Sequence, residues 1–245
     1  MKRIKYQADI DSQTLETLQA GMLGWYRQYG RELPWRQTRD PYAVIVSEIM
    51  LHQTTVNTVV PVYLRFMEKF PTVFDLASAP LEEVKHITDP LGYKVRGQWL
   101  KNIAEVIVTE HEGEWPKTLE GWMALPGVGR YTAGAVLSFA FEQDAAILDT
   151  NVRRVLGRYF GIAYRETRAE VVHRLWALAE AIVPKGEAFH FNQALMDFGA
   201  MVCTARHPAC TICPVVDQCV TVGEGVPEAA AEEVSAYTIR TRADP

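Results

Sequence analysis

The residues with the clearest capacity for chemistry in this 245-residue chain are its four cysteines, which all lie within residues 203–219. They are Cys203, Cys210, Cys213 and Cys219, spaced C-x6-C-x2-C-x5-C. Disulfides do not persist in the reducing cytosol, so a cytosolic chain that places all its cysteines in one loop is predicted to bind a metal. Four thiolates suit zinc or an iron–sulfur cluster, and both remain open here because zinc sites usually show two C-x2-C pairs and this loop has one.

A second candidate for chemistry is Glu48, the only Asp, Glu, Lys or Arg between Asp40 and Arg65 in the run "DPYAVIVSEIMLHQTTVNTVVPVYLRF". Most residues one helical turn away from it are apolar. We expect Glu48 to form part of a cleft wall, where desolvation would raise its pKa and let it donate a proton near neutrality. The alternative is an acid that points away from a helix whose other faces are buried.

Two further motifs combine a turn with a helix start. "LPGVGRYTAGAV" (125–136) predicts a tight hairpin between two helices, whose glycines let backbone amides approach a phosphate; the alternative is a plain helix–helix turn. In "AILDTNVRRVLGRYFG", Asp149 precedes a helix that starts near Asn151, and an ordinary N-cap is the simpler interpretation of this residue.

Composition places these motifs in an ordinary globular, mainly helical chain. The chain is 48% hydrophobic, which predicts one or two compact domains, and neither a signal peptide nor a membrane span fits, so we expect a cytosolic protein. The net charge of −5 does not indicate nucleic-acid binding, although basic clusters at 94–101 and 153–158 are compatible with a DNA-binding face. Besides a helix that begins at Pro41, amphipathic helices are predicted at 12–29, 54–69, 81–87, 94–110, 118–124, 131–142, 151–160, 167–183 and 190–202.

Together, "LPWRQTRDPYAVIVSEIMLHQTTV", "LPGVGRYTAGAV", "ILDTNVRRVLGRYFG", "FNQALMDFGAMVC" and the cysteine loop resemble the helix-hairpin-helix DNA glycosylase superfamily, which includes endonuclease III. The resemblance is greatest to its MutY-type adenine DNA glycosylase branch. It implies an all-α fold, with a six-helix barrel domain that carries the hairpin and a second domain with a 4Fe-4S cluster. The implied divisions are an N-terminal helix segment (1–36) that packs with the cluster domain, the barrel domain (37–145), the cluster domain (146–220) and an acidic, flexible tail (221–245).

The resemblance also implies roles in catalysis. Glu48 would be the general acid that protonates the leaving adenine, and Asp149, with Asn151 beside it, would stabilise the oxocarbenium-like sugar. Tyr131 stands where enzymes with lyase activity have the lysine that forms a Schiff base, so the chain is expected to release the base without strong lyase activity.

Further positions resemble the family's substrate contacts. The flipped adenine would lie against Trp35, Arg36, Tyr131 and Gln193. Gln53 and Tyr93 would enter the base stack, and Gly127 and Gly129 would bind phosphate. The full set of residues expected at DNA is His52, Gln53, Thr54, Tyr93, Lys94, Gly127, Gly129, Arg130 and Arg206. The four cysteines would hold the 4Fe-4S cluster, and the hairpin would hold a monovalent cation.

The implied function is base excision repair by a monomeric, cytoplasmic, nucleoid-associated enzyme that removes adenine opposite guanine or 8-oxoguanine from mismatched or damaged double-stranded DNA. Departures from the adenine branch are His52 for glutamine, Thr150 for glycine and Lys94 for an aromatic residue, and the chain ends about where the domain that reads 8-oxoguanine would begin. One alternative is a thymine/uracil–guanine mismatch glycosylase, although Gln193 favours adenine. Another is a non-catalytic iron–sulfur module that binds DNA or transfers electrons.

Overall fold

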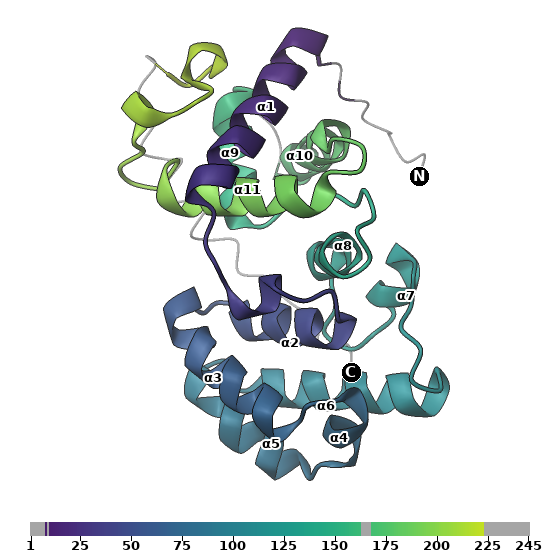
Figure 1. Cartoon of the computed structure of the whole chain (residues 1–245). Helices are drawn as coiled ribbons and strands as arrows, with labels where there is room; N and C mark the ends of the chain where they lie inside the picture. Colours follow the sequence, from purple (N-terminus) through teal and green to yellow (C-terminus); the bar gives the residue numbers. More distant parts are fainter. Residues whose placement is uncertain (1–7, 9, 163–167, 223–245) are drawn as a thin grey trace. The chain divides into compact units, whose positions relative to one another are not determined.

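The computed structural model describes residues 8, 10–162 and 168–222, and this part of the chain contains helices and no strand (Figure 1). The chain divides into two compact units, which we call the terminal unit (Met1–Arg31 with Asp144–Pro245) and the central unit (Glu32–Gln143). Among the described helices, none is long and apolar enough to cross a membrane. Most of the predicted acidic tail, from residue 223 onward, lies outside the described residues.

The central unit is built around α6, which packs against α2, α4 and α5, while α2 also packs against α3 and α8 (Figure 1). Its elements in chain order are η1 (Pro34–Arg36), α2 (Pro41–Leu51), α3 (Val56–Lys69), α4 (Val73–Ser78), α5 (Leu81–Thr88), η2 (Asp89–Leu91), α6 (Val95–Glu110), α7 (Leu119–Met123) and α8 (Arg130–Phe139).

The helix α2 is the most deeply buried element of the central unit. Asp40 caps it by accepting a hydrogen bond from the backbone N–H of Tyr42 at 3.0 Å, and Pro41 occupies the first helical position as predicted. Every residue from Tyr42 to Met50 is buried. The helix ends at Leu51 with His52 as its C-cap, and the next residue, Gln53, has a φ of +56°, so the chain turns sharply before α3.

One helix, α4, was not predicted from the sequence. It starts with a capping box, because the Thr72 hydroxyl accepts a hydrogen bond from Asp75 N and the Asp75 carboxylate accepts one from Thr72 N. Its six residues are too few to show a helical period. All the helices that were predicted occur, and the one predicted at 131–142 ends earlier, at Phe139.

The terminal unit joins the two ends of the chain. Its elements are α1 (Ser12–Tyr29), α9 (Thr150–Tyr159), α10 (Arg168–Ile182), α11 (Ala188–Met201), η3 (Cys210–Ile212) and η4 (Val216–Gln218). The helix α11 packs on both α1 and α9, and α9 packs on α10 (Figure 1). Beyond the end of α1, Arg31 forms an ion pair with Asp197 of α11, whose side chain is fully buried.

Candidate active site and metal centre

Glu48 lies in the interior of the central unit. It is 3% exposed, and the residues before and after it on α2 are also buried. Its neighbour Ser47 is fully buried and satisfies its hydroxyl by donating to the carbonyl of Val44 at 2.7 Å. A carboxyl group at this depth is desolvated.

The turn after α2 presents residues that the resemblance assigns to DNA. Gln53 and Lys94 are exposed, and Tyr93 is half-buried. His52 lies deeper, with Nε2 3.3 Å from the Thr132 hydroxyl and its ring edge-on to Trp99 at 6.0 Å. Burial, and then the charge of a neighbouring arginine, lowers the pKa of His52 to about 4, so this imidazole is neutral at pH 7.

The predicted hairpin forms between α7 and α8. Gly127 has a φ of +74°, and an added Cβ would lie 2.5 Å from the ring of Trp99, so both conformation and space require glycine there. Gly129 has an ordinary φ of −95°, and among the described residues no atom beyond its chain neighbours and the adjoining helix backbone lies within 4 Å of where its Cβ would be. Glycine at 129 therefore leaves the backbone at the start of α8 open, next to Arg130 and Tyr131 in its first turn.

Two residues expected in the base pocket lie on the short helix η1. Trp35 is 6% exposed and packs edge-on against Tyr63, with 5.2 Å between the ring centroids. Arg36 is half-buried at the end of the same helix. The packing of Trp35 fixes the plane of its indole ring.

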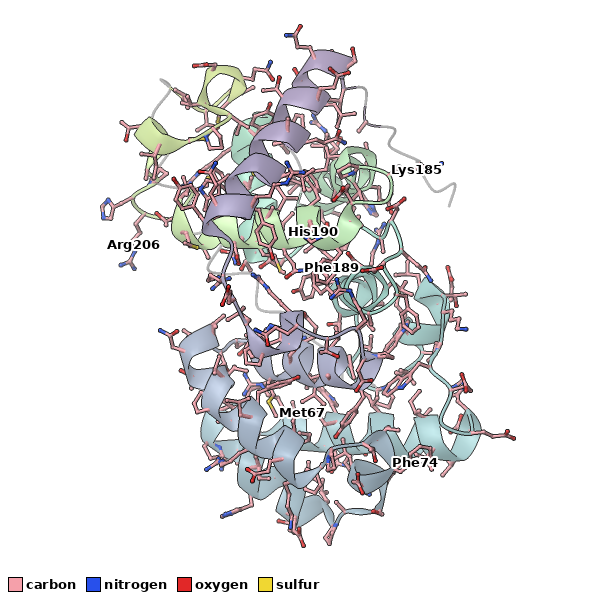
Figure 2. The ribbon with its side chains drawn as sticks, viewed as in Figure 1. Met67, Phe74, Lys185, Phe189, His190 and Arg206 are labelled. Carbon is pink, nitrogen blue, oxygen red and sulfur yellow. The ribbon has the colours of Figure 1, made fainter. Side chains whose placement is uncertain are left out.

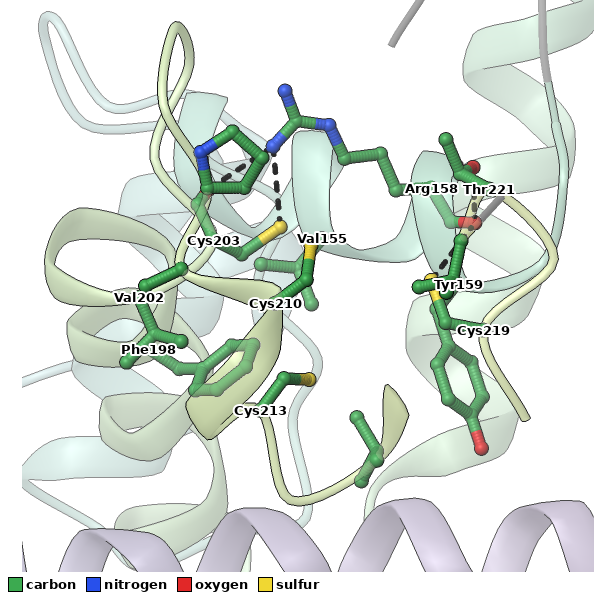
Figure 3. A pocket seen from close by; sticks show the side chains of 14 residues that line it. Val155, Arg158, Tyr159, Phe198, Val202, Cys203, Cys210, Cys213, Cys219 and Thr221 are labelled. Carbon is green, nitrogen blue, oxygen red and sulfur yellow. Dashed lines mark hydrogen bonds between the residues drawn. The ribbon is translucent and has the colours of Figure 1, made fainter. Parts of the chain in front are cut away.

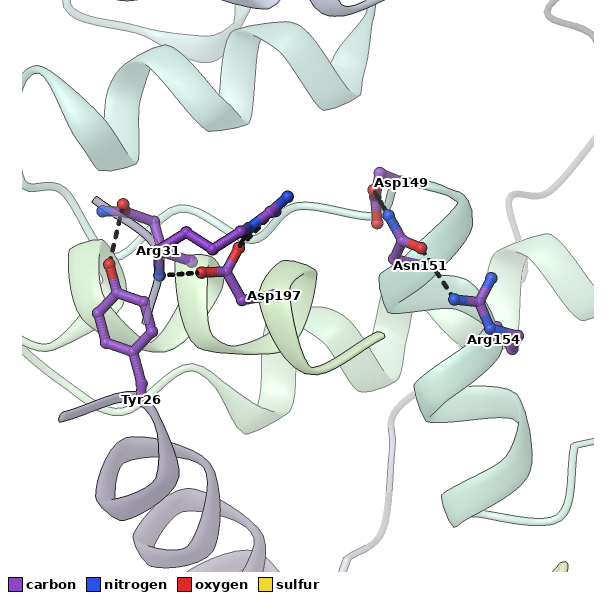
Figure 4. Close-up of polar contacts among 7 residues, drawn as sticks. Tyr26, Arg31, Asp149, Asn151, Arg154 and Asp197 are labelled. Atoms are coloured by element: carbon purple, nitrogen blue, oxygen red, sulfur yellow. Dashed lines mark hydrogen bonds and ion pairs between the residues drawn. The ribbon is translucent and has the colours of Figure 1, made fainter. Parts of the chain in front are cut away.

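In the terminal unit, Asp149 is the N-cap of α9. Its carboxylate accepts hydrogen bonds from Val152 N at 2.6 Å and from Asn151 Nδ2 at 3.0 Å (Figure 4). Burial raises the pKa of this carboxyl, and the two hydrogen bonds oppose that rise. The residue as a whole is half-buried.

A series of hydrogen bonds runs from this carboxylate to the cysteine loop. Asn151 Oδ1 accepts from Arg154 Nη2 at 2.8 Å (Figure 4). Arg154 also donates to the carbonyls of Cys203 (2.8 Å) and Gly199 (2.6 Å). Helix α9 comes close to α11 at this point because residue 199 is glycine. A Cβ added at Gly199 would lie 2.7 Å from the Cβ of Asn151. Asp149 and the first cysteine are thus fixed by the same helix.

Gln193 is 1% exposed on α11 and uses both ends of its amide within the terminal unit. Its Oε1 accepts from the Tyr26 hydroxyl at 3.2 Å, and its Nε2 donates to the carbonyl of Phe189 at 2.9 Å. These contacts fix which end of the amide is the donor and which is the acceptor.

The four cysteines line one pocket that is partly open to solvent (Figure 3). None of them forms a disulfide. Arg158 donates from Nη1 to the Sγ of Cys203 at 3.3 Å. Burial raises the pKa of Cys213 to about 11 and also raises that of Cys219, so neighbouring thiolates here need a cation to offset their charge.

The four thiols face the same pocket. Four thiolates suit either an iron–sulfur cluster or zinc, as the sequence indicated. Beside them, Arg206 is exposed and extends outward from the cysteine loop (Figure 2).

Part of each basic cluster is internal. In the clusters at 94–101 and 153–158, which are compatible with a DNA-binding face, Arg96, Lys101 and Arg158 are 0%, 8% and 9% exposed, whereas Lys94 is exposed. Each of the three buried side chains donates hydrogen bonds to backbone carbonyls of its own unit. The burial of these three side chains was not predicted, because the sequence around a buried arginine or lysine can look the same as that around an exposed one.

Family models match two parts of the chain. The model described as "HhH-GPD superfamily base excision DNA repair protein" matches residues 46–181, and the iron–sulfur binding domain of endonuclease III matches residues 203–219. The first match includes Glu48, the hairpin and Asp149. The second begins and ends at a cysteine.

Individual proteins show the same similarity. The adenine DNA glycosylase of Rattus norvegicus is 45% identical over 223 residues, covering 87% of this chain and 43% of that protein. The thymine-DNA glycosylase of Aeropyrum pernix is 38% identical over 215 residues, covering 86% of this chain and 96% of that protein. A solved structure of a thermostable thymine-DNA glycosylase superimposes with a TM-score of 0.82 at 34% identity, covering 89% of this chain and 100% of that one. The chain thus spans less than half the length of the rat protein that it matches.

Proposed function

Since this chain belongs to the HhH-GPD superfamily of base excision DNA repair proteins, we propose that it is a DNA glycosylase that flips mispaired adenine out of duplex DNA and hydrolyses its N-glycosidic bond. The observation that carries the proposal is the burial of Glu48, 3% exposed, on α2 within the matched region. The adenine would lie opposite guanine or 8-oxoguanine. The enzyme would act as a monomer in the cytoplasm, at the nucleoid.

Glu48 fits the first chemical need of this reaction. Adenine departs readily only as a neutral base, so an acid must protonate a ring nitrogen as the glycosidic bond breaks. Adenine has ring nitrogens with free lone pairs that can accept this proton. Thymine attached to deoxyribose has none, so a buried general acid favours a purine substrate.

Asp149 fits the second need, which is to stabilise the positive charge that develops on the sugar. Hydrogen bonds from Val152 N and Asn151 Nδ2 hold its carboxylate in place before substrate arrives. An oriented carboxylate stabilises an oxocarbenium-like sugar without rearranging during the reaction. Tyr131 is not an amine nucleophile, so the proposed reaction ends at the abasic site.

DNA recognition is proposed for two groups of positions, those that would contact the duplex and those that would contact the flipped base. Gln53 and Tyr93 would enter the base stack, and the open backbone at Gly129, with Gly127, would bind phosphate and a monovalent cation. The other proposed contacts to DNA or to the flipped base are Trp35, Arg36, His52, Thr54, Lys94, Arg130, Tyr131, Gln193 and Arg206.

The proposed cofactor is a 4Fe-4S cluster held by Cys203, Cys210, Cys213 and Cys219. The cluster would supply structural order and charge balance to the thiolates, and the hydrolysis itself is assigned to side chains elsewhere. Arg158 would donate a hydrogen bond to the sulfur of the first ligand.

A second candidate function is release of thymine or uracil opposed to guanine. It is favoured by the similarity to thymine-DNA glycosylases, such as that of Aeropyrum pernix, which is 38% identical over 86% of this chain. The buried acid and Gln193 favour adenine.

The test is single-turnover base release from duplexes that differ at one pair: adenine opposite guanine, adenine opposite 8-oxoguanine, and thymine opposite guanine. Glu48→Gln is compared with Ser47→Ala, an equally buried change on the same helix. Adenine release that depends on Glu48 supports the proposal. Thymine release alone would establish the second function, and DNA binding without release of any base would indicate a non-catalytic module. Strand breaks that appear without alkali would contradict the proposed lack of lyase activity.

A further inference from the structure

Arg96 is fully buried in the first turn of α6, yet it is absent from the chemistry proposed above. Its Nη2 donates to the carbonyl of His52 and to the hydroxyl of Thr54, and its Nη1 donates to the carbonyl of Leu91 at 3.1 Å. A single guanidinium therefore joins the turn after α2 to the segment that leads into α6.

The turn that Arg96 holds has an unusual backbone. Gln53 has a φ of +56°, a left-handed conformation that residues other than glycine rarely adopt. The two acceptors of Nη2, on His52 and Thr54, lie immediately before and after this residue. The bonds from Arg96 thus restrain both sides of the strained position, while the side chain of Gln53 itself stays exposed.

The second segment carries Tyr93. The guanidinium carbon of Arg96 lies 5.5 Å from the centroid of the Tyr93 ring, and the Thr54 hydroxyl lies 3.3 Å from the carbonyl of Leu91. Gly92, which lies between Leu91 and Tyr93, has a φ of +94°, which allows the chain to turn toward α6. The same guanidinium therefore sets the spacing between Gln53 and Tyr93.

Stability alone is a weak reason for this arrangement. In the part of the chain described, the Nε of Arg96 is buried without a hydrogen-bond partner, so the site accepts an imperfectly satisfied charge. A buried charge of this kind often stabilises a fold no better than an apolar side chain of similar volume. The planar fork of arginine, however, fixes several acceptors at set angles, which lysine cannot do.

We propose that Arg96 is a positioning residue for DNA recognition: it holds Gln53 and Tyr93 in the register in which both enter the base stack. The inference rests on the proposed function for its link to DNA, and on the hydrogen bonds above for its link to the turn.

The first measurement needs no DNA. Amide hydrogen exchange is followed at residues 52–55 and 92–95 in Arg96→Lys and in Lys101→Met, a change to the other buried cation of α6, which donates to the carbonyl of Ala77 instead. Arg96→Lys is expected to speed exchange in both segments by about tenfold, because the loss of about one hydrogen bond lowers the free energy of local opening. Lys101→Met should leave both unchanged. Unaltered exchange in Arg96→Lys would overturn the inference.

The second measurement is a double-mutant cycle on affinity for a mismatched duplex that carries an uncleavable substrate analogue. Arg96→Lys is expected to weaken binding about tenfold in the wild type and less than about twofold when Gln53 and Tyr93 are already alanine. Equal losses in both backgrounds would overturn the inference, because Arg96 would then act by another route. If Arg96→Lys does not fold, Thr54→Val removes one acceptor and should shift both measurements in the same direction.

The two results also separate this inference from the proposed function. Faster exchange in the free protein, together with no base release by the wild type, would refute the glycosylase proposal and leave the role of Arg96 in the turn intact.

Discussion

Acidification should weaken the central unit through His52. Burial, and then the charge of Arg96, lowers the pKa of this imidazole from its ordinary 6.5 to about 4. Between these values the unfolded chain binds a proton that the folded chain does not, so the free energy of unfolding falls as the pH drops from about 6.5 to about 4. Each pKa unit corresponds to about 1.4 kcal/mol, so the full loss is on the order of 3 kcal/mol, less where solvent reaches the ring.

The assay is urea unfolding of the full chain at several pH values between about 7 and 4, for the wild type and for His52→Gln. Glutamine retains a polar side chain near Thr132 without a titrating group, and it is the residue that the adenine branch usually has at this position. The wild type should lose about 3 kcal/mol more than the variant over this range.

A matched control is His111→Gln, which removes an exposed histidine of the same unit. It should follow the wild type at every pH. Acid effects on the cysteine loop are common to all three proteins and cancel in the comparison. Parallel curves for the wild type and His52→Gln would refute the reasoning, because they would show that His52 protonates in the folded state as easily as in the unfolded one.

Three further changes test the proposed chemistry. Glu48→Gln should lower single-turnover excision by at least about 100-fold with near-normal DNA affinity, and retained excision would exclude Glu48 as the acid. Asp149→Asn removes the negative charge, so excision should fall by a similar factor. Asparagine is still a good N-cap, so the free energy of unfolding should change by less than about 1 kcal/mol. A purely structural role of Asp149 predicts little change in turnover. Cys213→Ser should reduce bound iron and the visible absorbance of the cluster, with stability lost before activity. Stoichiometric zinc in a colourless, active wild-type protein would contradict this last expectation.

Much of the fold could be predicted from local signals. Asp40 and Asp149 mark the starts of α2 and α9, because an aspartate side chain accepts a hydrogen bond from a backbone N–H of the first helical turn. Pro41 fits the first helical position because it has no backbone N–H that would need a partner there. The capping box of α4, Thr72 with Asp75, was also present in the sequence, but six residues give no period by which to recognise a helix.

The supports of the site could not be predicted in the same way. Arg96 contacts the turn at His52, 44 positions earlier, and Arg158 contacts Cys203, 45 positions later. Neither partner can be inferred from neighbouring residues. Helical periodicity indicates on which side of a helix a side chain lies, but not which distant residue it contacts. Gln193 shows the same limit, because its partner Tyr26 lies 167 positions away.

The joining of both chain ends in the terminal unit has a consequence for how the protein is made. Helix α1 leaves the ribosome first, but its packing partner α11 begins only at Ala188. At typical bacterial and eukaryotic elongation rates, roughly 10–30 s separate the two. During that time the central unit, a continuous segment, can fold without waiting, whereas the apolar side of α1, with Leu18, Met22 and Trp25, has no partner from its own unit. We therefore expect the nascent chain to need a holding chaperone on α1, and iron to be loaded last, after the cysteine loop emerges.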